Sequence, residues 1–396
     1  MGRNKRTQLM LHGDEEHCLR ESTDRPTTHM RATRPRRAIL PSKSLTTRYL
    51  APHSNLVPAK ETQLKACTWL GGGDFEYGDV PDPVIGPDDV MVRIGTVGVC
   101  GTDVHITQGL FPSTPPQILG HEASGEIIDV GQNVSRERIG ESVVLNHTTT
   151  CGECESCRTW TVSRCERSTQ KHEFFAELAS VPNASAVPIP EGLDVEVASI
   201  TEPASCCLSG VSRLRVDDGA VGLVIGGGMM GLMTAAFMKT SGVETVALTE
   251  PVGYRRDFAT QLGIDVVHDP SQSSVDDFVA DLTNGRGLHI AAEAVGKAEL
   301  VAKCVELVRP RGQVLMIGVA PAGAPLPVDL YDMQYREVVL QSGFGRGDVF
   351  NRTPAELAKL NMDGVITGRY ELKDVPQAII DSGEGKGVKL VIKPNR

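Results

Sequence analysis

Long apolar runs are missing from this sequence of 396 residues, and no segment reaches the 18 apolar residues that predict a membrane-spanning helix. The first thirty residues are polar and lack the apolar core of a secretory signal peptide. These two absences lead us to expect a cytoplasmic protein. Aromatic residues make up only 4% of the chain, whereas it contains 41 glycines, a balance that favours an α/β protein with many tight turns.

An excess of positive charge is also missing. The chain has 40 lysines and arginines against 50 aspartates and glutamates, and its net charge of −10 disfavours nonspecific nucleic-acid binding. Residues 1–62 are the exception, with 12 basic and 6 acidic residues, which leaves −16 for the rest. This segment has few apolar residues in a regular pattern, so we predict a disordered basic tail that is dispensable for folding and activity. A translation start near Leu64 is an equally favoured interpretation, and a transit peptide or a basic nucleic-acid arm are the alternatives.

The rest of the chain is long enough for two domains, and the first of them has mainly strand patterns. No helical pattern exceeds one turn before about Val195, and glycine and proline punctuate the whole region. Alternating apolar residues predict strands at residues 65–70, 89–99, 124–130 and 142–145. We therefore expect a domain built mostly from β-structure.

The pattern changes at Ala220, where strand and helix patterns begin to alternate. Strands are predicted at 221–225, 245–249, 266–268, 290–294 and 314–319, and helices at 229–239, 254–262, 275–282 and 298–308. This series predicts a parallel sheet covered by helices. A helix at 354–360 and a strand at 389–392 are too few for a domain, so we expect them to complete the first one. The predicted domains are therefore 63–202 with 345–396, and 203–344.

A thiol, a hydroxyl and an imidazole lie within six residues at Cys100, Thr102 and His105, and His121 and Glu122 follow. Thiolate, imidazole and carboxylate are ligands that suit zinc, which makes a bound alcohol a stronger acid. The pattern indicates a zinc site, with Thr102 and His105 placed to carry a proton away. A buried cysteine with two unconnected histidines is the alternative.

Four of the ten cysteines lie within 15 residues, in the pattern Cys151-x2-Cys154-x2-Cys157-x7-Cys165. Such crowding without a signal peptide indicates metal binding rather than disulfides. Four thiolates complete a tetrahedral site and leave no position for a substrate, so we predict a structural zinc. The last gap of seven residues does not match the usual spacing of an iron–sulfur cluster. A zinc ribbon would need two separated pairs of cysteines, whereas this chain has one group.

A glycine-rich loop follows a strand pattern and opens a helical one, with Gly226, Gly228 and Gly231 in the order G-x-G-x-x-G around Met229 and Met230. This context predicts a dinucleotide-binding turn, in which the helix N-terminus faces the pyrophosphate. Glu250 ends the next strand, where a carboxylate accepts hydrogen bonds from the adenosine ribose and repels a 2′-phosphate. We therefore favour NAD over NADP, although Arg255 and Arg256 lie close by.

Glu202 stands between the two predicted domains, in the sequence Thr201-Glu202-Pro203. A carboxylate at a domain boundary can reach a metal from the far side of a cleft, and it can equally be an acidic residue at the start of a surface helix. The residues alone do not decide between these two interpretations.

Together these motifs resemble the zinc-dependent medium-chain dehydrogenases, from about residue 65 to 394. The motifs that carry the resemblance are Val-Gly-Val-Cys-Gly-Thr-Asp-Val-His, Leu-Gly-His-Glu-Ala-Ser-Gly-Glu, the four-cysteine lobe, Glu-Pro-Ala and the glycine loop. The chain is most similar to the polyol and threonine dehydrogenases, in which a Glu-Pro replaces the third cysteine ligand of simple alcohol dehydrogenases.

The resemblance implies a GroES-like β-barrel domain and a doubly wound Rossmann domain. It implies that Cys100, His121, Glu122 and Glu202 surround the catalytic zinc, that Thr102 takes the proton of the alcohol, and that His105 relays it. It places Val295, Ile317 and Val319 at the nicotinamide. A homodimer or homotetramer is expected, with a small alcohol or ketone as substrate and neither nucleic acid nor membrane as partner.

The implied reaction is the NAD-dependent interconversion of a secondary alcohol and a ketone, with a polyol, a cyclitol or an amino alcohol as substrate. Between Cys165 and Phe174 the chain is shorter than its relatives, and Lys171-His172-Glu173 stands where they have a longer loop. This departure leaves the substrate class open. A zinc-independent quinone or enone reductase and a noncatalytic NAD-binding regulator are the alternative functions.

Overall fold

The computed structural model describes residues 63–159, 164–345 and 347–395. The predicted tail lies outside the described residues. Within the described part, no helix is both long and apolar enough to cross a membrane.

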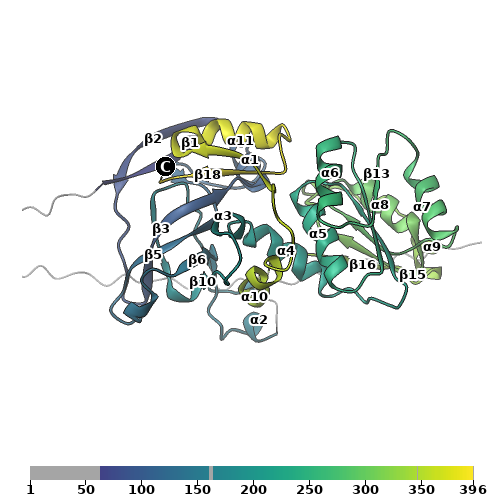
Figure 1. The fold of residues 1–396 in the computed structure, drawn as a ribbon, viewed down its shortest axis with the longest axis horizontal. Helices are drawn as coiled ribbons and strands as arrows, with labels where there is room; N and C mark the ends of the chain where they lie inside the picture. Colours follow the sequence, from purple (N-terminus) through teal and green to yellow (C-terminus); the bar gives the residue numbers. More distant parts are fainter. Residues whose placement is uncertain (1–62, 160–163, 346, 396) are drawn as a thin grey trace, which may run out of the picture. The chain divides into compact units, whose positions relative to one another are not determined.

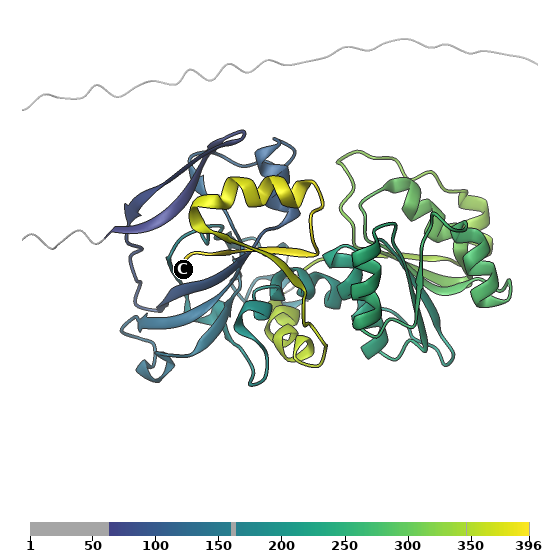
Figure 2. The ribbon, with the colours of Figure 1, turned by 45° about the horizontal axis from the view of Figure 1, so that its top comes forward.

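A seven-stranded, mostly antiparallel sheet forms the core of the first domain (Figures 1 and 2). Its strand order is β10-β6-β5-β3-β18-β17, and β9 also pairs with β3. The strands are β3 (Asp89–Gly98), β5 (Glu122–Val130), β6 (Ser142–Leu145), β9 (Leu178–Pro182), β10 (Ala186–Pro188), β17 (Ile366–Glu371) and β18 (Lys389–Lys393). Because β18 pairs with β3, the C-terminal strand belongs to the same sheet as the strands of the first domain.

Two small sheets flank the main one. In the first, β1 (Gln63–Gly71) pairs with β2 (Asp74–Pro81) and β4 (Gln117–Ile118). In the second, β7 (Thr148–Thr149) pairs with β8 (Thr169–Gln170). The four cysteines of the predicted zinc lobe all lie in the segment that joins β7 to β8.

The second domain contains a six-stranded parallel sheet in the order β13-β12-β11-β14-β15-β16, with helices on its faces (Figure 2). Its strands are β11 (Val221–Ile225), β12 (Thr245–Thr249), β13 (Val266–His268), β14 (Leu288–Glu293), β15 (Val308–Met316) and β16 (Val339–Ser342). Its helices include α5 (Met229–Thr240), α6 (Gly253–Gln261), α7 (Val275–Thr283), α8 (Ala298–Leu307) and α9 (Leu330–Tyr335). The strand order reverses at β11, so the predicted doubly wound fold is confirmed.

The structure corrects the sequence prediction at several element boundaries. The β-rich domain contains the two-turn helix α1 (Gly101–Thr107), although no helical pattern longer than one turn was expected. Its formation depends on a cap rather than on apolar periodicity. Strand β15 begins at residue 308 rather than 314, and helix α10 (Gly347–Leu357) begins seven residues before the predicted start and includes Pro354. The remaining helices are α2 (Glu155–Arg158), α3 (Val195–Ala198), α4 (Thr201–Val211) and α11 (Val375–Gly383).

Candidate active site and metal centres

Cys100 is the N-cap of helix α1, and this position fixes its thiol. The Cys100 Sγ accepts a hydrogen bond from the backbone N–H of Thr102 at 3.4 Å. In return, Asp103 Oδ2 accepts one from the Cys100 N–H at 2.9 Å. This reciprocal capping starts the helix without an apolar repeat. It also holds the thiol at the positive end of the helix, where a thiolate is stabilised.

His121 and Glu122 stand where β4 leads into β5. Gly120 has a φ of +87°, and a Cβ there would lie 2.9 Å from the Phe175 ring, so the turn before His121 requires glycine. Asp103 Oδ1 accepts a hydrogen bond from the Gly120 N–H at 3.3 Å and lies 3.7 Å from His121 Nδ1. Asp103 therefore connects the thiol on α1 with the imidazole at β5, in the manner of a carboxylate that orients a metal-binding histidine.

Cys100, His121 and Glu122 each place a metal-donor atom within 4.8 Å of the others. Among the described residues, His121 Nδ1 and both Glu122 oxygens are buried without a well-directed hydrogen bond. Burial disfavours a charge on His121, but Cys100 and then Asp103 raise its pKa well above the ordinary value. A thiol, an imidazole and a carboxylate gathered at one buried position form a donor set that fits zinc.

Lys389 is a buried cation at this site that the sequence analysis missed. Its Nζ forms an ion pair with Glu122 and donates a hydrogen bond to the Val99 carbonyl at 2.9 Å. Burial alone would lower the pKa of Lys389, but Glu122 and Cys100 raise it overall. The sequence does contain one clue to this role. Lys389 is the first residue of the otherwise apolar stretch Lys-Leu-Val-Ile, which forms a buried strand.

Glu202 lies in the first turn of α4 and its side chain is partly buried. It does not join the compact group of Cys100, His121 and Glu122. The pKa of Glu202 is raised to about 7, chiefly by burial. His121 lowers this pKa, whereas Glu122 raises it further. Its carboxyl therefore shares the electrostatic surroundings of His121 and Glu122, and the metal-ligand role stays a prediction.

Thr102 and His105 are three residues apart on α1, so their side chains share one side of this helix. Thr102 Oγ1 lies 3.6 Å from the Cys100 Sγ, next to the metal-donor group. His105 is exposed and lines a pocket together with Val295 and Val319. The helix thus extends from the metal-donor group to a pocket lined mainly by residues of the second domain.

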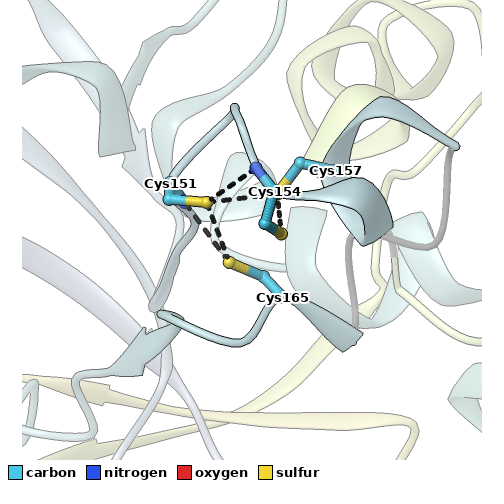
Figure 3. A group of neighbouring side chains, drawn as sticks. All are labelled: Cys151, Cys154, Cys157 and Cys165. Carbon is cyan, nitrogen blue, oxygen red and sulfur yellow. Dashed lines mark hydrogen bonds between the residues drawn. The ribbon is translucent and has the colours of Figure 1, made fainter.

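The four cysteines of the lobe converge on one point (Figure 3). The Sγ–Sγ distances are 3.9 Å for Cys151–Cys157, 3.5 Å for Cys154–Cys157 and 3.5 Å for Cys165–Cys151. Four sulfurs about 2.3 Å from one zinc would lie about 3.8 Å apart, so the cluster has the size of a tetrahedral zinc site. All four are free thiols, and Cys151 Sγ also accepts the Cys154 N–H at 3.3 Å.

The glycine loop joins β11 to α5 as predicted. A Cβ at Gly231 would lie 1.8 Å from the Gly226 carbonyl oxygen, so helix α5 can approach the loop only with glycine there. Glu250 is buried and its two oxygens accept backbone N–H groups, from Gly227 at 2.6 Å and Val252 at 2.9 Å. The carboxylate therefore stabilises the conformation of the loop, in addition to the ribose-binding role predicted from the sequence.

Two pockets extend from the glycine loop. One is lined by Cys100, Glu122, Met229, Met230 and Lys389, and connects the loop to the metal-donor group. The other lies against Gly226, Gly228, Glu250, Arg255 and Val295. The predicted metal and nucleotide residues thus meet in adjoining space.

Three other residues predicted to lie at the cofactor contact defined partners within the protein. Arg255 donates to the Gly385 carbonyl at 2.8 Å, and Arg256 pairs with Asp269 at 2.7 Å, so both arginines already have partners. Ile317 is buried and packs near Gly210 and Gly343 rather than beside His105.

Gly231→Ala is expected to lower the free energy of unfolding by about 2–3 kcal/mol, because the new methyl group would overlap the Gly226 carbonyl. Gly228→Ala is the matched control, since a Cβ at Gly228 meets nothing within 4 Å. It should fold normally and weaken NADH binding, because its methyl group would face the pyrophosphate. Thermal unfolding and NADH fluorescence titration measure the two effects. Equal stability of the two variants would contradict this account of Gly231.

Glu293 and two histidines also escaped the sequence analysis. Glu293 ends β14 fully buried, and its Oε1 accepts the backbone N–H groups of Val295 and Gly296, each at 2.7 Å. It therefore fixes the loop that carries Val295. His147 and His172 lie beside His121, and nothing in their spacing along the chain connects them.

The comparisons with known proteins agree with this geometry. Residues 86–191 match the family model of the alcohol dehydrogenase GroES-like domain, and residues 230–362 match that of the zinc-binding dehydrogenase. The chain is 31% identical to D-arabinitol dehydrogenase 1 of Uromyces fabae over 343 residues, which cover 84% of this chain and 98% of that protein. This chain belongs to the zinc-dependent medium-chain dehydrogenases.

Other relatives place the dehydrogenase in the polyol and threonine branch. It is 30% identical to the L-threonine 3-dehydrogenase of Rhizobium etli (strain CIAT 652), with 79% of this chain and 93% of that protein covered. A crystal structure described as a zinc-binding dehydrogenase from Sinorhizobium meliloti, bound to NADP, has a TM-score of 0.78 and 30% identity, and covers 84% of this chain and all of the other. The predicted family, fold and enzyme class are confirmed, and they favour an alcohol dehydrogenase over a quinone reductase or a regulator.

Proposed function

We propose that this dehydrogenase interconverts a secondary alcohol and a ketone, with one zinc held by Cys100 and His121, and with Glu122 and Glu202 within its surroundings. The compact donor group of Cys100, His121 and Glu122, next to the pocket that leads to the glycine loop, is the observation that carries the proposal. When bound, zinc would polarise the alcohol oxygen and NAD would accept the hydride. The cysteine lobe would hold a second, structural zinc.

The side chains of α1 would move the proton. Thr102 Oγ1, 3.6 Å from the Cys100 Sγ, is placed to accept the proton of the alcohol, and His105 at the pocket rim is placed to pass it to solvent. Asp103 would keep His121 oriented, and Lys389 would balance the charge of Glu122. Asp103 is held by backbone N–H groups and Lys389 by its ion pair with Glu122, so these two groups need little rearrangement before the reaction.

The cofactor that this site favours is NAD. Glu250→Ser should raise the KM for NAD by about tenfold and raise the ratio of NADP to NAD use, because a ribose acceptor and a negative charge are both lost. The exposed carboxylate of Asp257 on α6 provides the control, since Asp257→Asn removes the same charge away from the glycine loop. Steady-state kinetics with both nucleotides measure the effect. A tenfold preference of the wild type for NADP would contradict the role given to Glu250.

We also propose a homodimer or homotetramer in the cytoplasm, with residues 63–202 and 345–396 as the catalytic domain and 203–344 as the nucleotide domain. The edge strand β16, with Val339 exposed and with exposed Leu330, Tyr331 and Tyr335 nearby in the chain, supports self-association. Light scattering at micromolar concentration tests the oligomeric state.

Alcohol-dependent NADH formation tests the function itself. The purified protein is expected to contain two zinc ions per chain and to reduce NAD with at least one member of a panel of secondary alcohols, diols, pentitols, hexitols and L-threonine. Relatives named as D-arabinitol, L-threonine and sorbitol dehydrogenases motivate that panel. Nucleotide binding without turnover of any panel member would favour the noncatalytic regulator.

A further inference from the structure

Three histidines from distant parts of the first domain meet beside the metal-donor group. The ring centroids of His121 and His147 lie 5.3 Å apart, those of His121 and His172 5.3 Å, and those of His147 and His172 5.4 Å. His121 belongs to the metal-donor group, whereas the other two imidazoles have no role in the reaction described above. They therefore lie directly beside the metal-donor group.

A short β-ribbon holds the two additional histidines in place. His147 directly precedes β7 and His172 follows β8, and these strands pair through Thr148 with Gln170. The His147 carbonyl accepts the Lys171 N–H at 2.8 Å, and the Lys171 ammonium donates to the Ser180 carbonyl at 2.6 Å. Both rings are thus carried by backbone that is anchored on the barrel rather than on a free loop.

Each of the two rings has an unused polar atom directed into buried space. The Nδ1 atoms of His147 and His172 are inaccessible to solvent and have no hydrogen-bond partner among the described residues. An unpaired buried polar atom costs free energy, and such atoms commonly mark a position that a ligand or water fills. The histidines do not form another metal site, because the described residues bring three or more donor atoms within 4.8 Å only at the two groups already named.

The charges that act on these two rings come from neighbouring histidines alone. Apart from burial, only His121 and His172 lower the pKa of His147, and only His121 lowers that of His172. Among the described residues, no carboxylate, lysine or arginine shifts the pKa of either ring, so none is coupled to them as a counter-ion for a charged substrate group. The site offers imidazole nitrogens that donate or accept single hydrogen bonds.

On the basis of the proposed function, we propose that His147 and His172 bind the hydroxyl group next to the reacting carbinol and select an uncharged vicinal diol or polyol. A monohydric alcohol would leave both buried nitrogens unpaired. An amino acid or a hydroxy acid would bring a charged group beside the two imidazole rings, which provide no counter-ion for it. The two histidines thus discriminate against both kinds of competitor.

A four-carbon series tests the substrate class, because all its members share the same reacting group. The series is butan-2-ol, butane-2,3-diol, 3-aminobutan-2-ol, 3-hydroxybutanoate and L-threonine, with D-sorbitol as a longer polyol. The zinc-loaded wild type is expected to have a kcat/KM for the diol at least about tenfold above that for butan-2-ol and for each charged analogue. Equal use of the diol and butan-2-ol, or preference for a charged analogue, would overturn this inference. Failure to oxidise any member, including sorbitol, would instead overturn the proposed function.

Variants test the two side chains. His147→Leu and His172→Leu should each lower kcat/KM for the diol by about fivefold or more and change that for butan-2-ol by less than threefold. Glu173→Gln is the matched control, because Glu173 is exposed in the same segment and only pairs with Lys171. Zinc content and the unfolding temperature verify folding. An unchanged ratio of diol to butan-2-ol use in both leucine variants would overturn the assignment.

A binding measurement on the wild type keeps the test independent of variant folding and of turnover. Saturation-transfer NMR of the zinc-loaded protein without nucleotide should show stronger transfer to butane-2,3-diol than to butan-2-ol at equal concentration. His147→Gln and His172→Gln, which keep a hydrogen-bonding group, should retain more of this difference than the leucine variants. Equal transfer to both alcohols in the wild type would count against the two histidines as a hydroxyl-binding wall.

Discussion

Cys100→Ser is expected to remove one of two zinc ions per chain and to lower kcat by at least about a thousandfold. Cys100 supplies the single thiolate of the group that it forms with His121 and Glu122, and a serine hydroxyl is a much weaker zinc ligand. Serine is also a good N-cap, so helix α1 should persist and the loss should not reflect unfolding. Metal analysis and steady-state kinetics on the best alcohol measure both effects.

Thr102→Val is the comparison for this variant. Thr102 lies next to Cys100 but contributes no atom to the metal-donor group, so the valine variant should keep both zinc ions. Its kcat should nevertheless fall by about a hundredfold, because the proton acceptor is gone. Full activity of Cys100→Ser, or a single zinc in the wild type, would show that the catalytic metal has been assigned wrongly.

Cys154→Ser is expected to remove the other zinc and to lower the unfolding temperature by on the order of 10 °C. The four sulfurs all lie within 4.8 Å of one another, so loss of one ligand leaves three thiols crowded together without a cation. The catalytic zinc and measurable turnover should remain at low temperature. Differential scanning fluorimetry and metal analysis on the same preparation check the prediction.

Cys67→Ala controls for the loss of a cysteine as such. Cys67 is buried in the first domain and lies outside both metal-donor groups, so the alanine variant should keep two zinc ions and lose only packing. If Cys154→Ser keeps both metals and its unfolding temperature, the lobe is not a zinc site.

Most of the fold could be predicted from the sequence because its signals are local. The strand before Gly226 and the helix after it follow from apolar periodicity and glycine spacing, and the alternation continues through β15. The four cysteines lie close together in the chain, so their site could be predicted directly. Helix α1 could not, because it depends on hydrogen bonds between Cys100 and Asp103 rather than on an apolar repeat.

The parts of the site that the sequence concealed are those that form between distant segments. Lys389 reaches Glu122 across 267 positions of sequence only because β18 pairs with β3. His147 belongs to none of the motifs recognised in the sequence, and His172 stands where the chain is shorter than its relatives. Their proximity follows from the pairing of β7 with β8, two strands of two residues each, which are too short to produce a recognisable pattern.

The β7–β8 ribbon gives the cysteine lobe a second significance. The lobe is the long loop of a hairpin whose base carries His147 and His172, so a metal that cross-links the loop also limits how far the base can open. A structural zinc in the lobe would also hold the two histidines in place, so substrate selectivity and thermal stability would depend on the same metal. A chelator that removes only this zinc would then reduce the preference for one alcohol over another before the enzyme unfolds. Substrate selectivity would thus depend on the supply of zinc.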